Sequence, residues 1–584
     1  MLVINESMSI IKYKQMKKLI ECVQNFSEGR NLDVIKQIMY EIEKVNGVKL
    51  LDVDSGESTN RTVVTFVGTP EEVCEAAFRS VKKASEIIDM SKHKGIHPRI
   101  GATDVCPLVP VVNITMEEVV EYARKLAERV GNELNIPVYC YGNAAYSEER
   151  KDLAYCRSGE YEALLEKLQK PEWKPDFGPA KFNAKSGATA VGARDFLVAI
   201  NFNLNTTSTR RANAIAFDVR ERGRPKREGN KLTGKIIKDE NDNPVNIPGT
   251  LKSTKAMGWY IEEYGIAQVS MNITNISVTP VHIAFDEVFE KAAKRGVRVS
   301  GSEIVGLIPK KVLIDAGKYY LKKQKRSVGV SEDEIVKIAV KSMGLDDLKP
   351  FNPEEKVIEY ILEAQASRKK LIDFTCKDFA NETASDSPAP GGGSVSAYIA
   401  SLGAALGTMV ANLSSHKRGW DEKWEYYSNW AEKGQALNEE LLFLVDEDTN
   451  AFNKIMEAFI LPKKTVDEIA ARKNAIEQAT LYATQIPLRT MKVAFKAFEV
   501  CKEMAKNGQE SSISDVGVGT LTINAGIKGA FLNVKINAVQ LEDKNIAAQL
   551  IKEAENIVKS ADDIQQQILK IVESKLQVIT QQQK

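Results

Sequence analysis

Histidine and paired cysteines are scarce in this chain of 584 residues. Most metal centres and disulfide frameworks are built from these residues. The seven cysteines are odd in number, and no two are spaced as C-x-x-C. This argues against a disulfide framework and a structural zinc site, and favours a reducing compartment. The four histidines, His93, His97, His282 and His416, are too few for a site built from several of them. We therefore expect a cytoplasmic protein that holds no metal.

An excess of charge of either sign is also missing. Lys and Arg together number 80 and Asp and Glu 79, which leaves a formal net charge of +1. The chain as a whole therefore has no electrostatic attraction for nucleic acid or for an anionic membrane. Local clusters of Lys and Arg, such as the one between residues 220 and 238, are either solvated loops or surfaces that attract an anion.

Long apolar runs are absent except between residues 397 and 413, AYIASLGAALGTMVANL. This run contains Gly403-x-x-x-Gly407, a pattern of closely packed helices that also occurs in membranes. Its small and polar residues favour a buried helix of a soluble bundle over a membrane span. The basic N-terminus lacks the apolar run and cleavage site of a secretory signal, so we expect none.

The first part of the chain alternates between predicted strands and helices. Segments 48–54 and 61–68 are rich in Val, Leu and Thr, as strands are. Thr69 and Thr115 each precede a glutamate by three residues, which predicts two helices that begin with a capping box. We expect an α+β unit over residues 1–195 and a second one over 196–350.

From about residue 351 the pattern changes. Residues 351–369 are predicted to form a linker with a helical piece, and 370–584 contain no convincing strand. Between Leu550 and Ile571, apolar residues recur at steps of four and three, which predicts lengthwise packing against another helix. That partner is either in the same bundle or in a second subunit. The predicted fold class is two α/β (α+β sandwich) subdomains followed by an all-α helical bundle.

The histidines at 93 and 97 lie in the segment SKHKGIHPRIGATDVCP. Pro98 forces His97 into extended geometry, where an imidazole can exchange protons near neutral pH. Arg99 and Asp104 are close enough in sequence to orient a substrate or the ring. Two polar turns, 25–30 and 54–62, are further candidates for ligand contacts, although their side chains could equally cap their own backbone.

In the helical part, Asp448 interrupts an apolar stripe that we expect to face the core. The stripe consists of Leu441, Val445, Phe452, Ile455 and Phe459. A buried carboxylate needs a partner or a task, and burial raises its pKa, which suits general acid–base chemistry. A structural salt bridge is the alternative.

Two other features of the helical part are weaker signals. The turn before residue 395, APGGGS, allows backbone N–H groups to converge, and Ser394 is expected to cap the helix that follows. Asn533 and Asn537 lie one turn apart, and would either bind the edge of a flat heterocycle or bond across the bundle.

Seven segments in this order resemble one family, the bifunctional formimidoyltransferase-cyclodeaminases. They are ECVQNFSEGR, LLDVDSGESTNRTVVTFVG, IDMSKHKGIHPRIGATDVCP, SGEYEALLEKL, PEWKPDFGP, GATAVGARDFL and APGGGSVSA. The resemblance implies two reactions. The formimidoyl group passes from N-formimidoyl-L-glutamate to tetrahydrofolate, and 5-formimidoyltetrahydrofolate then cyclises to 5,10-methenyltetrahydrofolate with release of ammonia. It also implies a polyglutamylated folate, no metal or redox cofactor, and a ring-like homo-oligomer.

By the same resemblance, His97 is the acid–base residue of the transferase and Asp448 is the proton acceptor of the cyclodeaminase. The folate-binding stretch corresponds to Gly178, Pro179, Ala180, Lys181, Phe182, Asn183, Ala184, Lys185, Ser186 and Gly187. The alternative is a single-activity transferase whose helical domain serves only oligomerisation or folate binding. This sequence departs from the family in an extension before Lys17, in Ile96 beside the histidine, and in extra residues between Gly223 and Gly249.

Overall fold

The structure is a computed structural model that describes residues 18–57, 60–95, 98–230, 233–240, 242–364 and 370–582. The described residues form two compact units. The first holds 18–312 and 343–364, and the second holds 313–342 and 370–582. The N-terminal extension and Ile96 and His97 lie outside the described residues.

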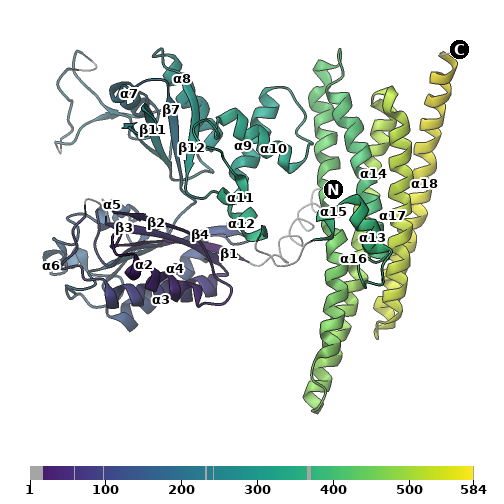
Figure 1. Cartoon of the computed structure of the whole chain (residues 1–584), viewed down its shortest axis with the longest axis horizontal. Coiled ribbons are helices and arrows are strands. Elements are labelled where there is room, and N and C mark those ends of the chain that lie inside the picture. The colour runs from purple at the N-terminus through teal and green to yellow at the C-terminus, as the bar shows by residue number, and fades with distance from the viewer. Residues whose placement is uncertain are drawn as a thin grey trace. The chain divides into compact units, whose positions relative to one another are not determined.

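The first unit begins with a six-stranded sheet in the order β2-β3-β1-β4-β6-β5. Its strands are β1 (Leu19–Phe26), β2 (Lys49–Gly56), β3 (Arg61–Gly68), β4 (Thr103–Val112), β5 (Val138–Gly142) and β6 (Thr189–Ala193). The pairs β4–β6 and β5–β6 are parallel and the other pairs are antiparallel. One face packs on α2 (Leu32–Glu43), α3 (Pro70–Ile87) and α4 (Met116–Leu134), which lie together below the sheet in Figure 1.

Local sequence signals explain where these helices begin. Thr69 and Thr115 form the predicted capping boxes with Glu72 and Glu118, so both predictions are confirmed. The opposite face of the sheet is covered at β5 and β6 by a second apolar cluster around Tyr139, which includes residues of α5 (Leu153–Cys156) and α6 (Leu164–Lys167).

A second, four-stranded sheet follows in the order β10-β11-β7-β12, with every pair antiparallel. Its strands are β7 (Val198–Leu204), β10 (Thr254–Ile261), β11 (Ile266–Ile273) and β12 (Val299–Val305). Helices α7 (Thr209–Val219) and α8 (Val281–Ala293) pack on this sheet. Between α7 and β10 the basic segment forms an arm that includes β8 (Arg224–Pro225) and β9 (Asn246–Ile247).

The chain then runs through four helices, α9 (Lys310–Lys323), α10 (Glu332–Met343), α11 (Pro353–Lys356) and α12 (Ile358–Ala364). After them, among the residues described from 370 onward, helices are the only regular elements. They are α13 (Cys376–Thr383), α14 (Gly392–Ser415), α15 (Trp424–Ile460), α16 (Val466–Asn507), α17 (Ile513–Val539) and α18 (Lys544–Gln582). The predicted fold class, two α/β subdomains followed by a helical bundle, is confirmed (Figure 1).

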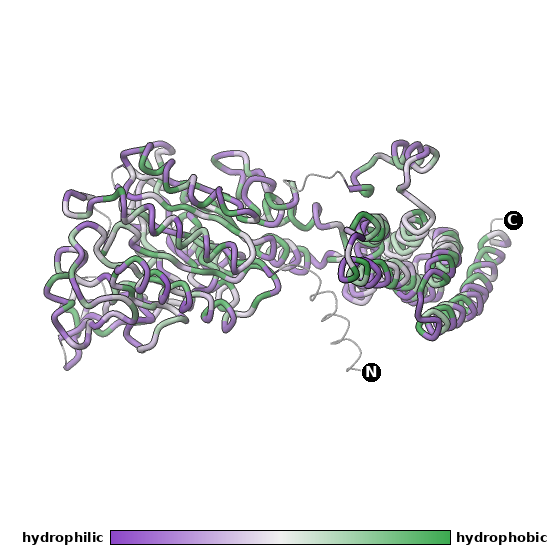
Figure 2. Tube along the Cα trace, turned by 90° about the horizontal axis from the view of Figure 1, so that it is seen from below, coloured by the Kyte–Doolittle hydropathy of each residue, from purple (hydrophilic) through white to green (hydrophobic). Residues whose placement is uncertain are grey.

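The apolar helix α14 packs inside this bundle. It is the one described helix that is long and apolar enough to cross a membrane, and 61% of its most apolar window is buried. Figure 2 shows apolar residues along the helices of the bundle. A Cβ atom on Gly403 would lie 2.6 Å from Ile523 and one on Gly407 would lie 3.1 Å from Cys501. The predicted glycine pattern therefore lets α14 approach α16 and α17 closely.

The predicted heptad seam lies on α18 and packs within its own bundle. Ala554, Ala561 and Ile568 are fully buried in the bundle core, and Ile557 and Ile564 pack against that core. Of the two partners considered for this seam, the same bundle is the one observed.

The stripe around Asp448 is only partly buried, which corrects the prediction of a continuous core face. Leu441 and Val445 are fully buried, but Phe452 and Phe459 are 41% and 49% exposed. The reason is that the ends of α15 and α16 project beyond the other helices of the bundle (Figure 1), so the C-terminal turns of α15 have fewer helices to pack on.

Candidate functional sites

The loop that carries His97 is fixed by the residues on either side of it. Asn60 accepts a hydrogen bond from His93 Nε2 at 2.9 Å with its backbone oxygen, and its side-chain amide donates to Lys94 at 3.0 Å. Arg99 Nε donates to His93 Nδ1 at 3.2 Å. His93 therefore supports the described residues on either side of positions 96 and 97. His97 itself lies outside the described residues, and its role as the proton carrier stays a prediction.

Arg99 and Asp104 both form contacts within the protein, and their predicted role in orienting a substrate or the ring stays a prediction. Arg99 is buried and pairs with Glu160 at 2.8 Å and with Glu162 at 2.6 Å, and these carboxylates hold its pKa above the ordinary value. Asp104 accepts a hydrogen bond from the Ile100 amide at 3.0 Å and forms an ion pair with Arg157.

Arg61, which lies in the predicted ligand turn 54–62 but was not named there, is the cation best placed to meet a ligand. It extends from the start of β3, and its guanidinium donates to Asn25 Oδ1 on β1. Burial and the nearby Arg157 lower its pKa, against the opposing effect of Asp104 and Asp54. Its Nε atom is buried, and no described residue accepts a hydrogen bond from it.

A small cavity, too narrow to admit a water molecule, lies among these groups at one end of the six-stranded sheet. It is lined by Phe26, Ser27, Asn60, Arg61, His93, Arg99 and Asp104. The cavity therefore lies directly beside the loop that carries His97, with a guanidinium N–H group as an unused donor.

The predicted folate-binding stretch, residues 178–187, is a surface loop whose two ends are tightly anchored. Gly178 and Gly187 have φ angles of +78° and +66°, and a Cβ atom on either would lie within 2.3 Å of a carbonyl oxygen, at Ile136 and Ile100 respectively. Only glycine fits both the dihedral angles and the close approach.

The second half of this loop adjoins the cavity region. Ala102 donates a backbone hydrogen bond to Ser186 at 2.8 Å, and Met90 donates one to Lys185 at 2.9 Å. Within the loop, Asn183 Oδ1 accepts from the amides of Lys185 and Ser186, both at 3.1 Å. The structure thus brings the predicted stretch against the segment that follows His97, while its binding of folate stays a prediction.

The four-stranded sheet carries a row of hydrogen-bonded polar side chains that the sequence analysis missed. Trp259 Nε1 donates to Gln268 at 3.1 Å, Gln268 donates to Asn203 at 2.9 Å, and Asn203 donates to Asp347 at 3.1 Å. An indole can only donate and a carboxylate only accept, so both amide orientations are fixed. Because the row joins three strands and the segment after α10, no single motif could have revealed it.

In the helical unit, Asp448 lies against the first turn of α14. Its Oδ2 atom is 3.2 Å from the Ser394 hydroxyl, which also donates to the Val445 carbonyl at 2.8 Å. Burial raises the pKa of Asp448, and the hydrogen bonds from Ser394 partly oppose this shift. No Lys, Arg or His of the described ranges forms a salt bridge with Asp448, so the structure gives no support to the salt-bridge alternative.

The glycines of the APGGGS turn explain this approach. A Cβ atom on Gly393 would lie 2.1 Å from Asp448 Oδ1, so only a residue without one leaves room for the carboxylate. Ser394 lies inside the helix and bonds α15 instead of capping α14, whose N-cap is Gly391, so the capping prediction is wrong. The turn serves to bring α14 within hydrogen-bonding distance of Asp448.

The two asparagines of α17 differ in role. Asn537 donates to the Ala483 carbonyl of α16 at 2.8 Å, which is the cross-bundle bond considered from the sequence. Asn533 donates to Gly529 of its own helix at 3.0 Å and lies next to Gly392 at the start of α14. Asn533 therefore remains the one of the pair close to the Asp448 region.

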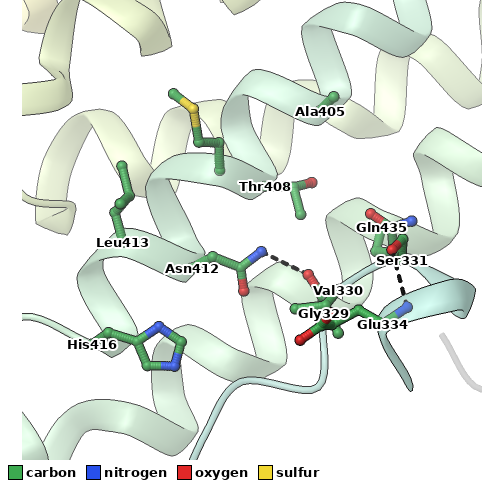
Figure 3. Close-up of a pocket in the computed structure, with 11 residues that line it drawn as sticks. Gly329, Val330, Ser331, Glu334, Ala405, Thr408, Asn412, Leu413, His416 and Gln435 are labelled. Atoms are coloured by element: carbon green, nitrogen blue, oxygen red, sulfur yellow. Dashed lines mark hydrogen bonds between the residues drawn. The ribbon is translucent and has the colours of Figure 1, made fainter. Parts of the chain in front are cut away.

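An open pocket of about 450 Å³ lies elsewhere in the helical unit (Figure 3). Asn412 of α14 donates to Gly329 at 2.7 Å there, and His416 lines its rim, with a pKa lowered by burial and by Arg326. Its lining residues on α14 begin at Ala405, which is about 17 Å along the helix from Ser394 at 1.5 Å per residue. The pocket is therefore separate from the Asp448 site.

The described residues thus define a two-centre enzyme. An α/β half has a polar cavity beside a histidine-bearing loop, and a helical half has a half-buried carboxylate of raised pKa. Within the described ranges, no three His, Cys, Asp or Glu side chains are grouped so as to hold a metal ion.

Sequence comparisons agree with this division. Residues 19–194 match the formiminotransferase domain, N-terminal subdomain, residues 199–363 the formiminotransferase domain, and residues 375–556 the formiminotransferase-cyclodeaminase family. The formimidoyltransferase-cyclodeaminase of Gallus gallus is 42% identical over 560 residues, which cover 96% of this chain and 100% of that protein. The chain belongs to the formimidoyltransferase-cyclodeaminase family.

Two shorter relatives each match one half. The glutamate formimidoyltransferase of Streptococcus pyogenes serotype M1 is 43% identical over 307 residues, which are 53% of this chain and 94% of that protein. The methenyltetrahydrofolate cyclohydrolase of Methylorubrum extorquens is 35% identical over 202 residues, which are 35% of this chain and 97% of that protein.

Proposed function

We propose that the chain catalyses two successive folate reactions. The α/β half transfers the formimidoyl group of N-formimidoyl-L-glutamate to tetrahydrofolate. The helical half cyclises the resulting 5-formimidoyltetrahydrofolate to 5,10-methenyltetrahydrofolate and releases ammonia. The observation that carries this proposal is the similarity to a formimidoyltransferase-cyclodeaminase along the whole chain, which includes both centres.

In the transfer reaction, an amine of tetrahydrofolate attacks the formimidoyl carbon and a tetrahedral intermediate forms. His97 takes the proton from the attacking amine and returns one to the departing glutamate nitrogen. Residues 178–187 hold the folate beside the segment that follows His97. Arg61 and Arg157 supply positive charge for the carboxylates of the glutamate substrate, since the guanidinium of Arg61 keeps a free donor.

In the cyclisation, N10 of the folate attacks the formimidoyl carbon and a C–N bond forms. Asp448 accepts the N10 proton, and the proton then leaves with the amino group as the second C–N bond breaks and ammonia departs. Burial raises the pKa of Asp448, so its carboxylate takes the N10 proton more readily than an exposed aspartate would and still carries that proton when the amino group departs. The Ser394 hydroxyl orients the carboxylate.

We further propose that the protein is a cytoplasmic homo-oligomer, acts as transferase and lyase on polyglutamylated folate, and uses no metal. Helix α17 carries apolar residues on two sides. This pattern is expected when other protein surfaces cover both sides of a helix. Its inner side is buried, and its outer residues are between 48% and 69% exposed: Val518, Leu521, Leu532, Ile536 and Val539. A second copy of the chain covers this outer side. The basic arm within 220–238 is a surface for the anionic folate tail.

The assembly is tested by analytical ultracentrifugation of the wild type and of Leu532→Glu. We expect the variant to sediment as a smaller species, and unchanged sedimentation would argue that another face joins the subunits. Glu439→Gln, which changes the charge of a residue on α15, is the control.

The function is tested by incubating the chain with N-formimidoyl-L-glutamate and tetrahydrofolate. We expect 5,10-methenyltetrahydrofolate absorbance to rise together with ammonia. Accumulation of 5-formimidoyltetrahydrofolate without ammonia would favour the alternative, a single-activity transferase whose helical half only assembles the oligomer.

A further inference from the structure

Glu21 is a buried carboxyl group that none of the steps above uses. It lies in the middle of β1, the third strand of six, and is 3% exposed. Its neighbours Ile20 and Cys22 belong to the core beneath α2–α4, so Glu21 points to the opposite face of the sheet. No described residue donates a hydrogen bond to it.

Such a group is costly for the folded protein. The residues directly across from it in β3 and β4 are Val67 and Val109, which offer no donor side chain. Arg194 influences Glu21 electrostatically but forms no hydrogen bond with it, and burial raises the pKa of Glu21 to about 7. Buried polar groups are nearly always hydrogen-bonded, and one that is not calls for an explanation.

The position of Glu21 links it to the transferase cavity. Strand residues two apart point to the same face, so Glu21, Val23 and Asn25 form one row on β1. Asn25, at the far end of the row, accepts the hydrogen bond from Arg61 beside the cavity. Asn25 is four residue steps along the strand from Glu21, a span of about 13 Å.

We propose that Glu21 binds the planar N–C–N edge of a substrate, with each carboxylate oxygen accepting one of two parallel N–H groups. This rests on the proposed function, in which both substrates have such an edge. Tetrahydrofolate has it in the pterin ring, at N3–H and the 2-amino group. N-formimidoyl-L-glutamate has it in its formamidinium group.

The span along β1 favours the pterin ring. The reacting carbon must lie within reach of the loop that carries His97, which adjoins the Asn25 end of the row. Glu21 is at the other end, so it meets a part of the substrate remote from the reacting carbon. The 2-amino edge of the pterin ring is such a part, whereas the formamidinium group contains the reacting carbon itself.

The test uses the full chain with Glu21→Gln, which keeps the shape of the side chain but replaces one acceptor by a donor. We expect the KM of the transferase for tetrahydrofolate to rise at least tenfold, with a smaller change in its KM for N-formimidoyl-L-glutamate. Glu43→Gln, on the exposed end of α2, is the control and should leave both constants unchanged. The infrared band of β-sheet reports whether the α/β half of each variant is folded, since the described part of the helical half contains no strand.

Three results would overturn the proposal or part of it. If neither KM changes, Glu21 binds no substrate. If only the KM for N-formimidoyl-L-glutamate rises, the assignment to the pterin ring is wrong. If Glu21→Gln fails to fold, Glu21→Met is used, and a folded Glu21→Met variant with an unchanged KM for tetrahydrofolate is equally decisive. A wild-type chain without transferase activity would instead count against the proposed function.

Discussion

At the scale of single residues, Asp448 is a carboxylate that is buried with no cation among the described residues to balance its charge. Its partners are a serine hydroxyl and the backbone, so neutralising it leaves no charge unpaired. We expect Asp448→Asn to lower the rate of cyclisation about a hundredfold or more, as the loss of a general base does, and to leave transfer intact.

The same variant separates catalysis from packing. If Asp448 were held in a buried salt bridge, its neutralisation would cost roughly 3–5 kcal/mol of stability. We therefore expect the melting temperature of Asp448→Asn to stay close to that of the wild type. A strongly destabilised variant whose folded fraction still releases ammonia normally would contradict the assignment.

His97 can be tested independently because it belongs to the other half of the chain. His97→Ala should abolish formimidoyl transfer, because His93, the other histidine of that segment, is held by structural contacts. Cyclisation of supplied 5-formimidoyltetrahydrofolate should continue at the wild-type rate. Normal transfer by a folded variant would show that another residue carries the proton.

The buried carboxyl at position 21 makes stability depend on pH. Its pKa is raised from 4.5 to about 7, so below pH 4.5 it is protonated in both folded and unfolded chains and has no effect. Between pH 4.5 and about 7 the unfolded chain releases its proton while the folded chain keeps it, so stability falls as the pH rises. At about 1.4 kcal/mol per pKa unit, the full loss is about 3 kcal/mol above pH 7.

Glu21→Gln removes this loss. We expect the variant to resist unfolding better than the wild type at pH 8 and to lose that advantage towards pH 5. The infrared band of β-sheet reports unfolding of the α/β half, since the described part of the helical half contains no strand. A variant less stable than the wild type at pH 8 would mean that Glu21 stabilises the sheet through contacts.

At the scale of elements, the contact between α14 and α15 depends on the absence of one side chain. Gly393→Ala would place a Cβ atom 2.1 Å from Asp448 Oδ1 and push the carboxylate aside. A displacement of about 1 Å can cost about a hundredfold in rate, and we expect a loss of that order in cyclisation. Gly391→Ala, two residues earlier in the same turn, meets no atom within 4 Å and should be nearly normal.

Elements were also the level at which the sequence was most informative. Capping boxes at Thr69 and Thr115 could be predicted because every atom involved lies within one turn of chain. Asp448 stood out because its neighbours along the helix are apolar. Arg61 and Glu21 did not stand out in the sequence. Their neighbours in the structure come from separate strands and depend on the register of strand pairing.

The exposure of Phe452 and Phe459 could not be predicted for a related reason. Periodicity shows which side of a helix is apolar but not where its neighbours end. The row from Trp259 to Asp347 shows the same limit in the other half, because it is assembled from residues up to 144 positions apart in sequence.

At the scale of the whole molecule, the chain divides less simply than its sequence pattern. The sequence pattern predicts boundaries at 195, 350 and 370, which truncated chains that begin or end there would test. Residues 313–342, which lie within the segment matched by the formiminotransferase domain, cluster with the helical unit. Their loop is fixed there, because Ser428 accepts a hydrogen bond from Val328 at 3.1 Å and Lys318 pairs with Glu432 at 2.7 Å.

This interleaving has a consequence for how the enzyme can be taken apart. The polypeptide passes from one unit to the other three times, near residues 312, 342 and 365. A protease that cuts once after residue 365 therefore cleaves the chain without separating the two fragments. The N-terminal fragment still carries α9 and α10, which belong to the helical unit. We expect the two fragments to co-elute in gel filtration until denaturant is added. Fragments that separate without denaturant would show that residues 313–342 do not stay bound to the helical bundle.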